Sequence, residues 1–287
     1  MSGQQEHNNT MKKISASIDF DSQRDKSVLL EVAVQNEPLL FGLWTFDVKL
    51  GKKTLLPVGK WSKTCEHKER QCEYIEIDLP LTDDYHLQRS MLVNHKDKVL
   101  LLSDTILADE ECAPNKPLSL QSEFYVSPKM QAKTSTEATE IMFRPVGQLS
   151  PPPFRVLPLA LPEWHTAKPT GLVIGTLTES EGVLTLRHES RGRSLFAPLF
   201  FDLNADKRGK RYTWRQLTVG ENLQRVPDDQ AVGYRIQLGK EQFLLYRSLT
   251  PLANRTVLGH NLIDDFCFAK FDPEVGVDPL IAVEVAE

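Results

Sequence analysis

The residues best suited to chemistry lie in one stretch, YHLQRSMLVNHKDKVLLLSDTIL, residues 85–107. There His86 could move a proton, Arg89 could bind an anion, and Asp104 could orient either of them. Together these groups would suit a carbohydrate-active enzyme with a site on a concave sheet. A later stretch of similar character would complete such a groove with Tyr234, Arg235 and Tyr246.

Alternation along the same stretch favours a structural role for two of these residues. Successive side chains of a strand point to opposite faces, so Arg89 points with Tyr85 and Leu87, away from His86. Asp104 interrupts an apolar run, where an unpaired carboxylate would be costly. We therefore expect a structural ion pair between Arg89 and Asp104.

A second stretch, residues 205–215, interleaves cations with aromatic rings. Arginine pairs with acidic groups and aromatic rings stack on sugar or base faces, so the pattern suits an anionic glycan. The alternative is a solvated hairpin tip whose two rings turn into the core. The candidate ligand-binding residues are Lys207, Arg208, Lys210, Arg211, Tyr212, Trp214 and Arg215.

Cys65, His67 and Cys72 are three closely spaced groups of a kind that binds metals. In such a site Cys65 and Cys72 would face each other across a hairpin, and the alternative is two small apolar residues on paired strands. A closed zinc site requires four ligands, and no fourth ligand is evident nearby. The sequence also lacks the GxGxxG, P-loop, HExxH and GxSxG patterns, so we expect neither a metal nor a cofactor.

Strands must position nearly all of these residues. Residues 85–94 alternate, whereas residues 99–102 are apolar on both faces, as in a strand buried between two layers. AVGYRIQL and QFLLYRSL form a hairpin that resembles this first one. About fifteen strand candidates and no amphipathic helix predict an all-β protein, a large antiparallel β-sandwich with two similar halves.

The chain divides by composition into four segments. Residues 1–25 are a polar, flexible tail, residues 26–144 and 171–287 are the two β-sheet halves, and residues 145–170 connect them. The connection holds seven prolines between Pro145 and Pro169, together with many apolar residues. We expect it to be an ordered crossing in extended conformation, packed on the body but outside a central sheet position.

Composition excludes several classes of partner. Of the 287 residues, 40% are hydrophobic and 25% are charged, and the net charge is −5, so we expect no nucleic-acid partner. No apolar run approaches the roughly 20 residues of a membrane span. Because the N-terminus lacks the apolar core of a signal peptide, we expect a cytoplasmic protein with four free thiols.

The first hairpin resembles one in the β-sandwich, or supersandwich, domain of heparinase II/III-type polysaccharide lyases. In that family a strand of the form (His or Gln)-x-Arg-x-x-Leu leads through a polar turn to an apolar strand that ends in an acidic residue. The family's catalytic toroid and its His-x-Asp motif have no counterpart here, so the resemblance implies the fold and not the activity. The residues that carry the resemblance are His86, Gln88, Arg89, Leu92, Leu101, Leu102 and Asp104, although Leu87 stands at the His or Gln position and His86 and Gln88 flank it.

Because no catalytic motif is present, we expect a non-catalytic binding or interaction module, for an acidic carbohydrate or a protein partner. The alternative is a carbohydrate-active enzyme, lyase-like or isomerase-like, with the groove described above. A third alternative is a protein whose sheet edges pair with a partner.

Overall fold

Every regular element in the described part of the chain is a β-strand. The all-β prediction is therefore confirmed, and all the strand pairs are antiparallel. None of these residues forms a helix that is long and apolar enough to cross a bilayer. The computed structural model describes residues 14–20, 27–34, 36–69, 71–109, 116–147, 154–166, 173–204, 212–251, 253–272 and 274–284.

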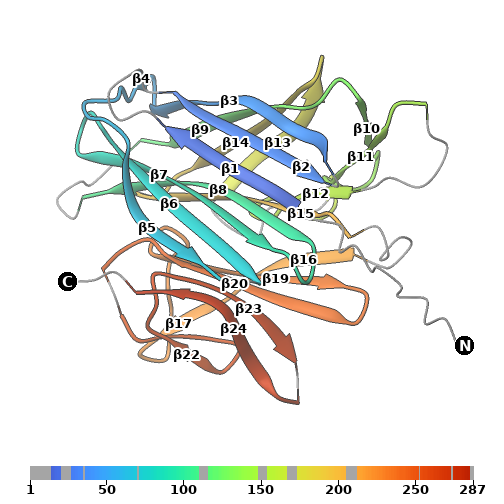
Figure 1. Ribbon diagram of the computed structural model, residues 1–287. Helices are drawn as coiled ribbons and strands as arrows, with labels where there is room; N and C mark the ends of the chain where they lie inside the picture. Colours follow the sequence, from blue (N-terminus) through green and yellow to red (C-terminus); the bar gives the residue numbers. More distant parts are fainter. Residues whose placement is uncertain are drawn as a thin grey trace, which may run out of the picture.

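Two large sheets form the upper part of the molecule (Figure 1). The first sheet has the order β1 (Ile14–Phe20), β2 (Val28–Val34), β3 (Glu37–Leu50), β9 (Leu118–Tyr125), β14 (Val183–Ser190) and β13 (Val173–Ser180), with β4 (Lys53–Thr54) paired to β3. The middle sheet has the order β10 (Met130–Thr134), β11 (Ile141–Pro145), β12 (Phe154–Pro158), β15 (Leu195–Asp202), β8 (Val99–Ala108), β7 (Tyr85–Asn94), β6 (Cys72–Leu81) and β5 (Ser62–Lys68).

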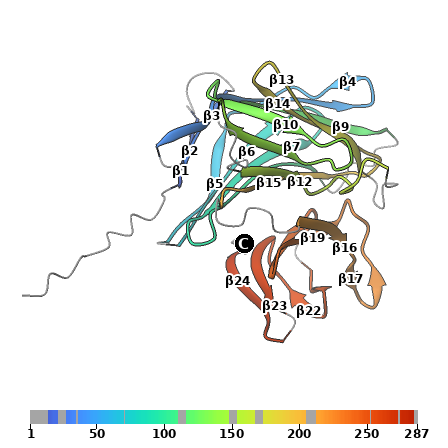
Figure 2. The same cartoon turned by 90° about the vertical axis from the view of Figure 1, so that its right-hand side faces the viewer.

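Two smaller sheets lie on the other side of the middle sheet (Figure 2). The C-terminal sheet has the order β16 (Tyr212–Leu217), β19 (Ala231–Leu238), β20 (Glu241–Ser248), β23 (Phe266–Asp272) and β24 (Gly276–Val283). The small sheet has the order β18 (Gln224–Arg225), β17 (Val219–Glu221), β21 (Arg255–Val257) and β22 (His260–Leu262).

The middle sheet is buried on both faces. Leu100 and Leu102 of β8 belong to the core shared with the first sheet, whereas Leu101 belongs to the core shared with the C-terminal sheet. This confirms the prediction drawn from the apolar run at residues 99–102, and it explains why the run does not alternate. A third core packs the opposite face of the C-terminal sheet against the small sheet, with Tyr246 and Val257 among its members.

Both predicted hairpins are present. β7 and β8 pair along their full length, with Arg89 opposite Asp104, and β19 pairs with β20. The strands of residues 171–287 are divided among the sheets, because β13 and β14 extend the first sheet and β15 lies inside the middle sheet.

The described part of the proline-rich crossing corrects one expectation. We expected residues 145–170 to lie outside a central sheet position, but β12 pairs with β11 on one side and with β15 on the other. The reason is that Pro158 is the last residue of β12, so residues 154–157 keep the backbone N–H groups that a central strand needs.

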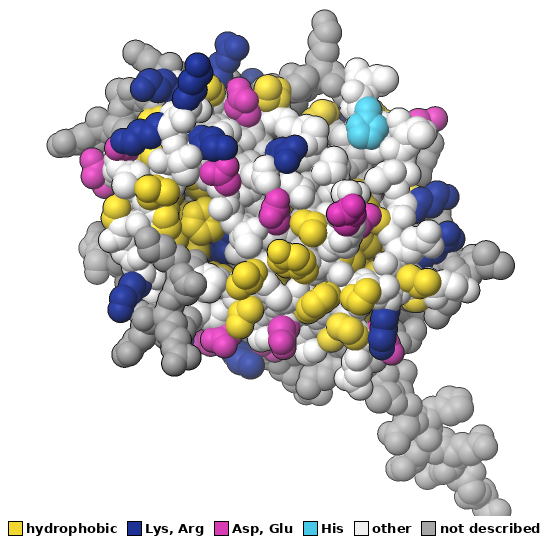
Figure 3. Space-filling model, turned by 90° about the horizontal axis from the view of Figure 1, so that it is seen from above, with side chains coloured by type: hydrophobic (Ala, Val, Ile, Leu, Met, Phe, Trp, Pro, Cys, Tyr) yellow, Lys and Arg dark blue, Asp and Glu magenta, His cyan; other side chains and the backbone are white. Residues whose placement is uncertain are grey.

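The outer face of the first sheet is more apolar than strict alternation predicts. Alternation in β3 buries Trp44 and Val48, and it leaves Phe41 and Leu43 outside with exposed fractions of 45% and 40%. Register places Leu29 of β2 opposite Leu43. Apolar side chains gather across the middle of this face in Figure 3.

Candidate functional site

A cleft of about 540 Å³ lies between the end of β8 in the middle sheet and the loops around the C-terminal sheet. We call it the inter-sheet cleft. Its volume falls in the range of small-ligand sites. One wall comes from the end of β8 and the turn before β15, and the other from β17, the turn before β19 and the segment after β20. The lining residues that matter for its function are Ala108, Arg193, Asp229, Thr250, Ala253 and Arg255.

Arg255 makes the second wall rigid. Its side chain is 3% exposed, and Nε donates to Glu221 Oε2 at 3.0 Å. Nη1 donates to Ser248 Oγ at 2.7 Å and to the Gln230 carbonyl at 3.1 Å, while Nη2 donates to Thr250 Oγ1 at 2.6 Å. These bonds engage all three guanidinium nitrogens within the protein, so Arg255 shapes the cleft and is not its ligand-binding cation.

A close turn contact joins the two walls. The backbone N–H of Arg193 donates to Asp229 Oδ2 at 2.9 Å. A Cβ atom at Gly192 would lie 2.3 Å from Asp229 Cβ, so only glycine permits this approach. The Arg193 guanidinium lines the cleft and donates through Nη2 to the Asp109 carbonyl at 2.8 Å. Arg193 is therefore the cation that we assign to the site.

His86 does not line the inter-sheet cleft, but its ring lies near Asp109, the residue that follows Ala108 of the cleft wall. Its Nδ1 is 3.0 Å from Asp78 Oδ2, and its Nε2 is 3.9 Å from Asp109 Oδ1. Asp109 follows Ala108 of the cleft wall, and its carbonyl accepts the bond from Arg193. The imidazole is 35% exposed and is oriented by carboxylates, which is an arrangement that supports proton transfer.

The predicted ion pair between Arg89 and Asp104 is present in the core between the first and middle sheets. Arg89 Nε donates to Asp104 Oδ1 at 2.9 Å, and the side chains are 0% and 1% exposed. Nη1 donates to the Trp44 carbonyl and Nη2 to the Thr45 carbonyl at 3.2 Å. Ser122 Oγ donates to the other oxygen of Asp104, so the pair ties β7 and β8 to β3 and β9.

The six groove residues predicted from the sequence do not come together. Arg89 and Asp104 face the first sheet, whereas His86 faces the opposite side of the middle sheet. Tyr234 is 1% exposed in the core between the middle and C-terminal sheets. Tyr246 and Arg235 point to the other face of the C-terminal sheet. Arg235 follows Tyr234 directly in β19, so its side chain points the opposite way, and Tyr246 belongs to the core between the C-terminal and small sheets.

The stretch of cations and aromatic rings at residues 205–215, which we call the basic stretch, is only partly within the described residues. Lys207, Arg208, Lys210 and Arg211 lie outside them, and Arg215 is exposed on β16. Trp214 is 3% exposed, and its Nε1 donates to the Leu161 carbonyl at 2.9 Å.

Tyr212 is likewise held against the protein. Its hydroxyl donates to Asp202 Oδ2 at 2.5 Å, and the Arg155 guanidinium carbon lies 4.1 Å from the centroid of its ring. Burial, and then the Asp202 carboxylate, raise the pKa of Tyr212. Both rings of the stretch therefore contact the protein, as in the hairpin-tip alternative.

Cys65 and Cys72 do not face each other, but they lie on the paired strands β5 and β6, as the apolar alternative has it. Cys65 lies opposite Glu76 in the β5–β6 pair, whereas Cys72 lies beside the turn, where its carbonyl accepts a hydrogen bond from the backbone N–H of Glu69 at 2.9 Å. Burial raises the pKa of the Cys72 thiol to about 12, so it stays protonated at neutral pH. Among the residues that the structure describes, no three His, Cys, Asp or Glu side chains form a metal-binding group.

A second buried ion pair escaped the sequence analysis. Glu76 accepts hydrogen bonds from Arg247 Nη1 and the Tyr74 hydroxyl, each at 2.8 Å, and from Thr64 Oγ1 at 3.0 Å. Arg247 also donates through Nη2 to Gln88. Burial lowers the pKa of Arg247, but the Glu76 carboxylate, together with Tyr74 and Asp265, raises it above its ordinary value. The signal was a polar interruption at Arg247 in an apolar strand, like that at Asp104.

Replacing Glu76 by glutamine is expected to lower the free energy of unfolding by about 2 kcal/mol. The amide keeps the shape of the carboxylate but leaves the Arg247 guanidinium, which is 6% exposed, without its counter-charge. Urea unfolding measures the loss. The control is Glu189→Gln on the exposed face of β14, which should change stability by less than about 0.5 kcal/mol. Equal effects of the two substitutions would contradict the assignment.

No protein-family model and no curated protein matches this chain. Solved structures do match it. The heparan sulfate lyase HepC from Pedobacter heparinus aligns over 84% of this chain and 43% of its own, with 10% identity and a TM-score of 0.45. A heparinase III gene product aligns over 77% of this chain and 36% of its own, with 9% identity and a TM-score of 0.48. The resemblance is one of fold. This chain spans less than half the length of these two proteins.

Proposed function

We propose that this protein is a non-catalytic binding module that holds an acidic carbohydrate in the inter-sheet cleft. The observation that supports the proposal most is the cleft itself, a cavity of about 540 Å³ whose walls are held by the hydrogen bonds of Arg255 and by the bond from the Arg193 backbone N–H to Asp229. A preformed wall loses little freedom when a ligand binds, which favours affinity.

The chemistry of the walls fits such a ligand. Arg193 supplies a positive charge for a uronate or sulfate group, while Asp229 and Thr250 offer oxygen atoms to sugar hydroxyls. Leu249 and Pro251 add apolar surface that can contact the C–H faces of a sugar ring. The three described cysteines are free thiols, which supports a cytoplasmic location as part of the same proposal.

A glycan array tests the proposal with the purified protein. We expect binding to uronic or sulfated glycans that weakens as salt rises, because exposed charges are screened. Arg193→Gln should weaken binding about tenfold, equivalent to the loss of one charge-assisted contact. Absence of binding to every glycan, or binding that Arg193→Gln leaves unchanged, would contradict the proposal.

The same array separates the cleft from the basic stretch. A variant with serine at four positions removes the cations that the sequence suggested. It should bind as the unchanged protein does if the cleft is the site. Loss of binding in that variant alone would move the site to the stretch. The four positions are Lys207, Arg208, Lys210 and Arg211.

The orientation of His86 favours a second candidate, a carbohydrate-active enzyme. An imidazole that is held by carboxylates beside a ligand cleft could act as a general base. A turnover assay on any glycan that binds tests this candidate. Turnover that falls about 100-fold in His86→Gln would favour the enzyme, and the lack of turnover would favour the binding module.

A further inference from the structure

A groove of about 180 Å³ runs along the free edge of β1. β1 pairs with β2 along Ile14–Phe20, and no described strand pairs with its other edge. The groove is lined on that side by Ala16, Ser17 and Ile18 and on the far side by β5 and β6 of the middle sheet. An unpaired strand edge offers a row of N–H and C=O groups to another extended chain.

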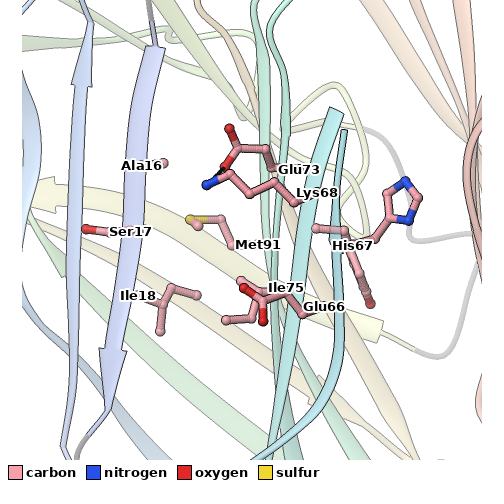
Figure 4. Close-up of a pocket in the computed structure, with 10 residues that line it drawn as sticks. Ala16, Ser17, Ile18, Glu66, His67, Lys68, Glu73, Ile75 and Met91 are labelled. Carbon is pink, nitrogen blue, oxygen red and sulfur yellow. Dashed lines mark ion pairs between the residues drawn. The ribbon is translucent and has the colours of Figure 1, made fainter. Parts of the chain in front are cut away.

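The side chains of the groove leave room beside β1 (Figure 4). Met91 and Ile75 form an apolar floor opposite Ala16 and Ile18. Lys68 and Glu73 lie together toward one end, and Glu66 lies toward the other. The His67 ring points away from the groove. An incoming strand would therefore meet apolar surface at its centre and charge at its ends.

β1 lacks the devices that protect several of the other edges. Natural sheets block their edges with lysine, proline or bulges. The middle sheet has two edge strands. β10 carries Lys133, and β5 carries lysines and a register shift. The edges of the C-terminal sheet carry Arg215 in β16 and Pro279 in β24. The sequences of β1 and β13 contain no lysine, arginine or proline, and of these two strands β1 borders the groove.

The charge of the groove favours a basic partner. The β5–β6 wall carries the carboxylates of Glu66, Glu69 and Glu73 and the ammonium groups of Lys63 and Lys68. Of the residues that line the groove, Glu66 and Glu73 are acidic and Lys68 is basic, so acidic groups outnumber basic ones there. A strand whose outward residues are lysine or arginine would complement this balance, because opposite charges across an interface favour association.

We propose that the free edge of β1 binds an extended, basic segment of a partner protein by adding it as a strand to the first sheet. Backbone hydrogen bonds to β1 would supply affinity, and the groove floor would receive one apolar side chain of the partner. This site is separate from the inter-sheet cleft and does not depend on carbohydrate binding.

A pair of proline variants tests the proposal. Successive N–H groups of a strand point to opposite edges, so one of Ala16→Pro and Ser17→Pro removes a bond to β2 and the other removes a donor facing the groove. The variant that loses a bond to β2 should have a lower melting temperature, whereas the variant that loses a donor facing the groove should have a nearly unchanged one. The probes are fluorescein-labelled nonapeptides of alternating lysine and valine, or of alternating glutamate and valine, measured by fluorescence anisotropy.

We expect the lysine peptide to bind at least about tenfold more tightly than the glutamate peptide. The proline variant with an unchanged melting temperature should lose at least about tenfold in affinity. Equal binding of both peptides, no binding, or full affinity in that variant would overturn the proposal. Light scattering measures whether the protein is a dimer. A dimer that the same proline variant no longer forms would also overturn the proposal, because the edge would then bind a second copy of the chain.

Discussion

Replacing Arg89 by alanine is expected to lower the free energy of unfolding by about 3–5 kcal/mol. The substitution leaves the Asp104 carboxylate charged and buried, and among the side chains that the structure describes only Ser122 still donates to it. It also removes the donors to the carbonyls of Trp44 and Thr45, which join the middle sheet to the first sheet. The guanidinium carbon further lies 4.5 Å from the centroid of the Trp44 ring, a cation–π contact that alanine cannot make.

Urea unfolding of three variants measures this effect. Arg215→Ala on the exposed face of β16 is the matched control and should cost less than about 0.5 kcal/mol. Arg89→Met with Asp104→Leu removes both charges, so it should be more stable than Arg89→Ala. If Arg89→Ala cost no more than Arg215→Ala, the pair would not be what joins the two sheets. If Arg89→Ala does not fold, the double variant still tests the pairing.

The second large effect is a loss of folding stability at low pH that His188 causes. His188 is 2% exposed on β14, and neither ring nitrogen has a hydrogen-bond partner among the described residues. Burial lowers its pKa from 6.5 to about 3. Between these values the unfolded chain binds a proton that the folded protein does not, so the stability linked to His188 is present above pH 6.5 and is lost as the pH falls toward 3.

His188→Leu removes this proton-linked term and keeps the site apolar. The free energy of unfolding of the unchanged protein should fall relative to the variant by about 1.4 kcal/mol per pH unit below 6.5. At pH 4.5 the relative loss is about 2.7 kcal/mol. Urea unfolding at pH 7.5, 5.5 and 4.5 provides the comparison. Parallel pH profiles of the two proteins would show that His188 is not held neutral in the core.

Local patterns predicted the features that depend on neighbours along one strand. Period-2 alternation placed Arg89 on the same face as Tyr85 and Leu87, and the polar interruption at Asp104 predicted its pairing with Arg89. The run in β8 that is apolar on both faces indicated a strand between two layers. Alternation also gave the inward direction of Trp214 as the alternative to a ligand-stacking ring.

Features that join distant elements were beyond such patterns. Glu76 and Arg247 are 171 residues apart, and no local spacing reports that β6 and β20 face each other. The inter-sheet cleft draws on the ends of several strands and on turns, so no single motif marks it. The central place of β12 depends on which residue of the crossing is proline, and the crossing's high proline content hid this detail.

The central claim is that the inter-sheet cleft binds an acidic carbohydrate, and calorimetric titration with a short oligogalacturonate tests it most directly. Ala253→Trp fills the cleft without removing a polar group, and Thr178→Trp places the same ring on the exposed edge strand β13. We predict that Ala253→Trp lowers affinity at least about tenfold, whereas Thr178→Trp binds as the unchanged protein does. Equal affinities of all three proteins, or no binding by any of them, would contradict the account.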